Sequence, residues 1–356
     1  MTERPQVPGP AASAALRRLE LTIVRRLEGY LHGEHLGLLP GPGTDLAEAR
    51  LYRPGEDDVR LMDWAVTART TNPHVRDVIA DRELETWALV DMSPSMDYGT
   101  AAIEKRELAV AAVGTIGYLT QKLGDRFGGF VLRSDQLRRW PPRSGRLALY
   151  GLLRSLLTEP SEPAATPGRG RTRTPASEAG PTLVSALDQM SRVPARRGLR
   201  IVVSDFLDGA ADAVDLLAQG GVGDRSGANP RSAYRASTAP AWQRPMRRLA
   251  ERHQVLAIEV GDPREREIPD VGVVWFTDPE TGVTREVDTS NPRTRALFAQ
   301  AAAYHSERVR NALRTIGVAH LELSTDRDWV TDLARFVFTY RRVAAKLHGS
   351  PTGGRR

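Results

Sequence analysis

The stretch Trp87-Ala88-Leu89-Val90-Asp91-Met92-Ser93-Pro94-Ser95-Met96 places one carboxylate and two hydroxyls directly behind an apolar run. Four apolar residues followed by turn-forming residues predict a buried strand whose polar residues emerge at its carboxyl end. Ligands of open α/β sheets bind at that edge. Because Asp91, Ser93 and Ser95 occupy alternate positions, a short loop would direct three oxygens toward one point. Oxygen ligands of low total charge suit Mg²⁺ better than Zn²⁺.

A second apolar run, residues 199–206, also delivers a carboxylate, Asp205, at its carboxyl end. If the two strands are parallel neighbours, Asp91 and Asp205 share one rim of the sheet. The alternative role for Asp205 is to cap the following helix. Strand and helix patterns alternate along most of the chain, and this order predicts an α/β fold with a doubly wound, mainly parallel sheet.

Composition and charge limit the class of protein. The chain has 356 residues, 40% of them hydrophobic, which is enough for one large or two ordinary domains. Its net charge of +6 is modest and favours a solvated surface over a nucleic-acid groove. The absence of cysteine fits a reducing cytosol. No apolar run approaches the roughly 20 residues that cross a bilayer, so we expect a cytoplasmic protein without direct membrane insertion.

We expect three parts along the chain. Residues 1–82 form an amino-terminal helix, within 11–31, and an extended arm; residues 83–348 form the main domain; residues 349–356 form a disordered tail. Two insertions rich in Gly, Pro, Ser and Arg, at 159–180 and 219–240, are predicted to be flexible. The remaining predicted helices are 100–123, 146–157, 182–190, 242–252, 291–314 and 329–346, and the remaining strands are 126–132, 136–140 (ended by two prolines), 254–260 and 318–323.

Two motifs resemble known families. Asp91-x-Ser93-x-Ser95 is similar to the metal-ion-dependent adhesion motif of von Willebrand factor A domains. Residues 53–64, Arg-Pro-Gly-Glu-Asp-Asp-Val-Arg-Leu-Met-Asp-Trp, followed by Ala68-Arg69, resemble the signature of the bacterial domain-of-unknown-function family fifty-eight. That resemblance implies a von Willebrand A-like fold with a hairpin insertion at 263–288. It also implies a MoxR-type AAA+ ATPase as partner, since genes of the family usually lie beside one.

The resemblance also implies a ligand set for the metal. Ser93, Ser95 and Thr182 would bind Mg²⁺, or Mn²⁺ or Ca²⁺, directly, and Asp91 and Asp205 would bind it through waters. Asp208 is close enough in sequence to replace Asp205. A partner's Asp or Glu would complete the coordination. From the residue alone, Thr182 is more simply the N-cap of its helix.

The signature segment supplies the candidate partner-binding residues Arg53, Asp57, Arg60, Trp64 and Arg69. In the structural interpretation, its alternating charges form ion pairs that hold the arm against the domain, with Trp64 as the apolar anchor. In the functional interpretation, the same segment is a docking surface for a partner. The sequence alone favours the structural interpretation and leaves the other open.

We therefore expect a metal-dependent interaction module that is not an enzyme. Two alternatives remain. One is a metal-dependent hydrolase that uses the same ion as a Lewis acid, although no histidine lies beside the strand-end carboxylates in sequence. The other is nucleic-acid binding through the Arg-rich loops, which contain no aromatic residue among Arg169, Arg171 and Arg173 to stack on a base.

Overall fold

The computed structural model describes residues 49–52, 62, 64–70, 72–76, 85–101, 103–120, 126–158, 180–193, 198–207, 239–277 and 284–348. The predicted helix within 11–31, almost all of the two insertions, Asp208 and the tail lie outside these residues. The described residues divide into two compact units, one covering 85–336 and the other covering 49–76 with 337–348.

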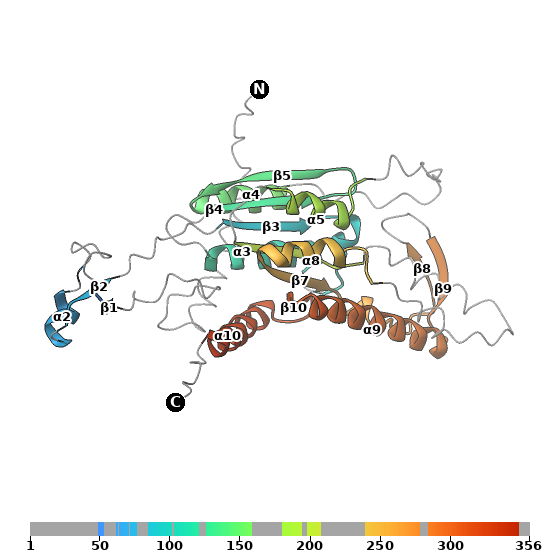
Figure 1. Cartoon of the computed structure of the whole chain (residues 1–356). Helices are drawn as coiled ribbons and strands as arrows, with labels where there is room; N and C mark the ends of the chain where they lie inside the picture. The colour runs from blue at the N-terminus through green and yellow to red at the C-terminus, as the bar shows by residue number, and fades with distance from the viewer. Residues whose placement is uncertain are drawn as a thin grey trace, which may run out of the picture. The chain divides into compact units, whose positions relative to one another are not determined.

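A six-stranded sheet forms the centre of the first unit (Figure 1). Its neighbouring strands are parallel except for one antiparallel pair at an edge. This arrangement confirms the predicted doubly wound, mainly parallel sheet. In spatial order the strands are β10 (Ala319–Ser324), β7 (Gln254–Gly261), β6 (Leu199–Ser204), β3 (Glu85–Asp91), β4 (Arg126–Leu132) and β5 (Leu137–Ser144).

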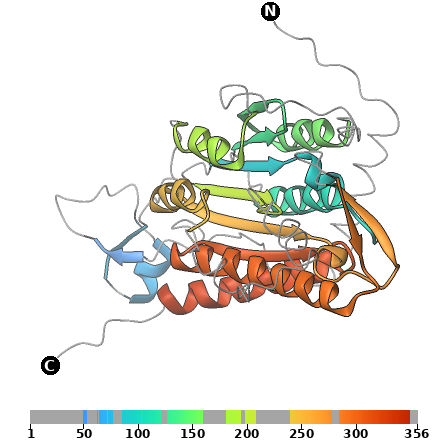
Figure 2. The same cartoon turned by 90° about the vertical axis from the view of Figure 1, so that its right-hand side faces the viewer.

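Helices cover both faces of this sheet, which is why β3 and β6 are buried along their whole length. One face carries α5 (Leu183–Ser191), α8 (Gln243–Arg252) and α9 (Pro292–Thr315), whose apolar residues join one core with Trp87 and Leu89 of β3. The other carries α3 (Lys105–Thr120), α4 (Arg146–Thr158) and the start of α10 (Trp329–His348), where Val330 packs with Leu119. Figure 2 shows α5 and α8 opposite α3 and α4.

Two boundaries differ from the predicted ones. The edge strand β5 continues through Pro141 and Pro142 to Ser144, because an edge strand pairs on one side only and needs no N–H donor on the other. Its partner β4 makes room with Gly128, where a Cβ would approach Pro142 N and Trp140 O to 3.0 Å. Helix α3 begins at Lys105 rather than Thr100, because the backbone and hydroxyl of Thr100 donate to Asp262, at 2.8 and 2.6 Å.

The predicted hairpin is present as β8 (Val273–Thr277) and β9 (Thr284–Asp288), and residues 278–283 of its turn lie outside the described part. The hairpin follows β7 after the short 3-10 helix η3 (Pro263–Glu265). Figure 1 shows it beyond the end toward which β3 and β7 point. Phe276 stacks with Phe298 of α9, whereas Val273 and Trp275 are exposed.

The amino-terminal arm departs from the extended conformation that we predicted. It contains a short strand pair, β1 (Ala49–Leu51) with β2 (His74–Arg76), and a helix, α2 (Trp64–Thr70). Trp64 is 71% exposed within its own unit, and its predicted role as an anchor on the main domain stays a prediction. Arg53, Asp57 and Arg60 lie outside the described residues.

Within the described part of the chain, none of the helices combines the length and apolar character that a membrane span requires.

Candidate functional site

Asp91 and Asp205 lie together at the carboxyl edge of the sheet. The strands that carry them, β3 and β6, are adjacent and parallel, with Val90 opposite Val203. From β3 the chain continues to β4 on one side, and it returns later to β6 on the other side. This reversal creates a topological switch point, where doubly wound sheets bind their ligands.

The Asp91 carboxylate is buried and held on both oxygens. The Ser93 backbone N–H donates to Oδ1 at 3.0 Å, and the Ser204 hydroxyl donates to Oδ2 at 2.7 Å. Burial, together with the negative charge of Asp205, raises the pKa of Asp91 to about 6. The site therefore contains excess negative charge that a cation would neutralise.

The two motif serines lie side by side. Ser93 precedes the short 3-10 helix η2 (Pro94–Asp97), and Ser95 lies within it. Their Oγ atoms are 3.2 Å apart. Neighbouring ligands of an octahedral ion with bonds of about 2.1 Å are about 3.0 Å apart, so this pair fits two adjacent positions around Mg²⁺. The serine geometry and the charge of Asp91 are thus both compatible with a divalent cation.

Asp205 has a partner that the sequence did not predict. The ammonium of Lys105, the first residue of α3, lies 2.8 Å from Asp205 Oδ2 and 2.5 Å from Glu265 Oε1 of η3. Burial acts to raise the pKa of Asp205, but the charge of Lys105, together with hydrogen bonds from Lys105, the Leu207 N–H and Ser95, lowers that pKa below its ordinary value. For Lys105, burial acts to lower the pKa, and the two carboxylates outweigh it and raise the pKa.

The backbone turns sharply after Asp205. Phe206 adopts a positive φ of 56°, a conformation that is uncommon for a bulky residue. Its ring packs on Trp242, with ring centroids 5.0 Å apart, and its N–H donates to Ser204 Oγ at 3.0 Å. These contacts hold the turn that places Asp205 beside Lys105.

Thr182 takes the N-cap position of α5. Its Oγ1 accepts the Ser185 N–H at 3.3 Å, and the Ser185 hydroxyl reciprocates by accepting the Thr182 N–H at 2.9 Å. Gly180, just before it, packs so closely on the Ser134 backbone after β4 that a side chain has no room. The loop therefore lies by the carboxyl end of β4. A hydroxyl that accepts one hydrogen bond retains a second lone pair, so capping is compatible with the predicted metal ligation, which stays a prediction.

The hydrolase alternative requires a base near these carboxylates. His305 of α9 is close, but its ring hydrogen bond goes to the backbone of Asp205. Burial lowers the pKa of His305, and its Nε2 is buried with no hydrogen-bond partner in the described structure. This places an imidazole behind the Asp205 turn, bonded to its main chain. Trp64 and Arg69, two of the predicted partner-binding residues, belong to the other compact unit.

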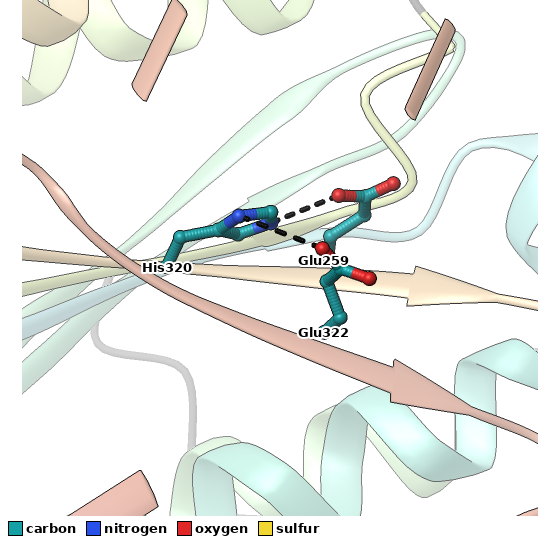
Figure 3. Close-up of side chains that lie close together, drawn as sticks. All are labelled: Glu259, His320 and Glu322. Carbon is teal, nitrogen blue, oxygen red and sulfur yellow. Dashed lines mark hydrogen bonds and ion pairs between the residues drawn. The ribbon is translucent and has the colours of Figure 1, made fainter. Parts of the chain in front are cut away.

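A second cluster of possible ligands lies on β7 and β10 (Figure 3). His320 Nε2 is 2.8 Å from Glu259 Oε2, and its Nδ1 is 3.9 Å from Glu322 Oε1. The two ring nitrogens thus face different carboxylates, although one metal ion would use only one of them. Arg310 also donates hydrogen bonds to Glu322 Oε1 from Nε at 3.1 Å and from Nη2 at 2.7 Å. The hydrogen bond of His320 joins β10 to β7, and the ion pair of Arg310 with Glu322 joins α9 to β10.

Comparisons with known proteins found similar proteins in mycobacteria. An uncharacterized protein of Mycobacterium tuberculosis is 45% identical over 345 residues, covering 97% of this chain and 95% of that protein. A shorter uncharacterized protein of Mycobacterium avium is 38% identical over 208 residues, covering 58% of this chain and 97% of that protein.

Two solved structures with detectable similarity have low sequence identity to this chain. The conserved hypothetical protein BatB from Bacteroides thetaiotaomicron is 14% identical with a TM-score of 0.36, covering 73% of this chain and 99% of that chain. A von Willebrand factor type A protein from Catenulispora acidiphila is 11% identical with a TM-score of 0.30, covering 75% of this chain and 43% of that chain. The family model described as protein of unknown function DUF58 matches residues 48–308, and the chain belongs to that family.

Proposed function

We propose that this protein is a non-enzymatic protein-interaction module whose binding depends on a divalent metal ion, Mg²⁺ or, in its place, Mn²⁺ or Ca²⁺. Ser93, Ser95 and Thr182 would hold the ion directly, and Asp91 and Asp205 would hold it through water. When bound, the ion supplies a positively charged coordination position to a partner's oxygen ligand. Placement in the cytoplasm is part of this proposal.

One observation carries the metal dependence. The adjacent hydroxyls of Ser93 and Ser95, 3.2 Å apart, lie in the same loop as a buried carboxylate, Asp91, whose pKa is raised to about 6. Burying a negative charge without a matching positive one costs free energy. A divalent ion at the serines would offset that cost and hold both hydroxyls as ligands.

The chemistry of the ligands suggests what the partner contributes. Neutral hydroxyl ligands leave the ion electron-poor, so a carboxylate from a partner gains more there than at a site already filled with carboxylates. The family resemblance suggests a MoxR-type AAA+ ATPase as that partner, with this protein as its adaptor in chaperone-like assembly or maturation. The exposed Val273 and Trp275 of the hairpin, on the chain segment that follows Glu265, offer apolar area for the same contact.

Recognition is favoured over hydrolysis by the environment of the nearby histidine. A general base must reach the proton that it removes, directly or through one water. The His305 ring instead makes its hydrogen bond to the backbone of Asp205. This arrangement supports a structural role for the imidazole and a binding role for the site.

The test is calorimetric titration of Mg²⁺ and Mn²⁺ into the wild-type protein and into Asp91→Ala. The matched control is Asp97→Ala, which removes a nearby carboxylate that is paired with Arg106 at 2.9 Å. We expect saturable binding that is lost in Asp91→Ala and kept in Asp97→Ala. A pull-down with a purified MoxR-type ATPase, with and without chelator, then tests the partner. Equal capture in chelator would refute the metal dependence.

A further inference from the structure

Lys105 is an unusual residue for its position. Its side chain is fully buried, with 0% exposure, although lysine is almost never fully buried without partners. It also begins helix α3, where the positive end of the helix dipole disfavours a cation. Its placement is therefore explained by the two carboxylates that it contacts, Asp205 at 2.8 Å and Glu265 at 2.5 Å.

Those carboxylates belong to the rim of the candidate metal site. Asp205 directly follows β6, and Glu265 lies in η3, the short helix that follows β7. Asp262 holds η3 in place, since its own N–H donates to Glu265 Oε2 at 2.9 Å and its carboxylate accepts from Thr100 and Thr325. Asp91, Asp205 and Glu265 thus contribute carboxylates to this rim, and the Lys105 ammonium contacts two of them.

We infer that Lys105 is the resident counter-cation of this site: its ammonium neutralises Asp205 and Glu265 when no divalent ion is bound, and it thereby lowers the affinity of the site for the ion. The inference rests on the proposed function, because it concerns the same metal. Its physical basis is charge. A lysine ammonium in contact with Asp205 repels a divalent ion that uses the same carboxylate, while it removes the cost of leaving Asp205 buried and charged in the metal-free protein.

A purely structural role makes the opposite prediction. If Lys105 only orients Asp205, then its removal displaces a metal ligand and weakens metal binding. If Lys105 competes by charge, its removal leaves a more negative site that binds the ion more tightly. The sign of the change in affinity therefore separates the two roles.

The experiment uses the full chain with Lys105→Met, which keeps an unbranched side chain of nearly the same length and removes its charge. Glu265→Gln removes the negative charge of the Lys105–Glu265 pair, whereas Lys105→Met removes its positive charge. Arg106→Met is the matched control, because it removes an adjacent positive charge of α3 that is paired with Asp97. The readouts are calorimetric titration with Mg²⁺ and Mn²⁺, and thermal unfolding in chelator and in excess metal.

We expect Lys105→Met to bind Mg²⁺ at least tenfold more tightly than wild type. It should lose thermal stability in chelator and regain it in metal, whereas the wild type changes less. Glu265→Gln should bind more weakly, and Arg106→Met should stay within about twofold of wild type. If Lys105→Met is unfolded in chelator, recovery of its fold by added Mg²⁺ supports the inference, and failure to recover in any metal concentration counts against it.

Unchanged or weaker metal binding by a folded Lys105→Met overturns the inference and leaves the proposed function intact. Unchanged or tighter binding by Glu265→Gln also overturns it. If the wild type binds no metal but Lys105→Met binds in a manner abolished by the additional change Asp91→Ala, the inference holds and metal dependence of the wild type fails. If neither protein binds metal, both proposals fail.

Discussion

Replacing Asp91 with asparagine tests directly whether this rim is built for a cation. Burial and Asp205 raise the pKa of Asp91 from 3.8 to about 6. A carboxyl group with a higher pKa in the folded chain binds its proton more tightly there, so its ionisation destabilises the fold. A change from 3.8 to about 6 corresponds to about 3 kcal/mol, at about 1.4 kcal/mol for each tenfold change in proton affinity.

In chelator at pH 8, Asp91→Asn should therefore raise the free energy of unfolding by about 1–3 kcal/mol. Asparagine keeps an acceptor for the Ser93 N–H but alters the bond from the Ser204 hydroxyl, which reduces the gain. Asp205→Asn, at the same rim, should do the opposite. It leaves the buried Lys105 with a weaker partner and should lower the free energy of unfolding by up to about 3–5 kcal/mol.

The assay is urea unfolding of the three proteins, in chelator and again in excess Mg²⁺. Under the proposed function the order of wild type and Asp91→Asn reverses in Mg²⁺, because only the wild type gains free energy from binding the ion. The reasoning is refuted if Asp91→Asn is less stable than wild type in chelator, or if Asp205→Asn is more stable.

Three further predictions concern the titration of Asp91, the N-cap of α5 and the packing of β4 against β5. Because the pKa of Asp91 is raised to about 6, the metal-free wild-type protein should lose stability relative to Asp91→Asn as the pH rises from about 4 through about 6. The affinity of the wild-type protein for Mg²⁺ should fall when the pH is lowered through about 6. Urea unfolding checks the first prediction and calorimetric titration the second, each across this pH range. Thr182→Ala should cost about 1 kcal/mol by removing the N-cap of α5, whereas Thr182→Ser should cost less, as measured by urea unfolding. Gly128→Ala should cost about 1–3 kcal/mol, read from thermal unfolding, because the new Cβ meets the β5 backbone at Trp140 and Pro142.

Most of the sheet could be predicted from local sequence signals. An apolar run that ends in Asp91 and another that ends in Asp205 predicted two buried strands, and these strands are β3 and β6, which are parallel neighbours in the sheet. The signal is local because a strand buried on both faces needs an uninterrupted apolar run. The two prolines after Trp140 were misjudged, since their effect depends on whether the strand lies at an edge, which local sequence does not reveal.

The electrostatics of the site depended on the tertiary structure. Lys105 is separated by 100 residues from Asp205 and by 160 from Glu265, so no spacing rule joins them. Ser204 could have been suspected, as it precedes Asp205, but its hydroxyl bonds Asp91, which lies 113 residues earlier. Sequence by itself determined the fold class and the strand-end carboxylates, because burial patterns repeat locally. Only the folded chain decided which charge faces which, because ion pairs form between residues that the packing of separate elements brings together.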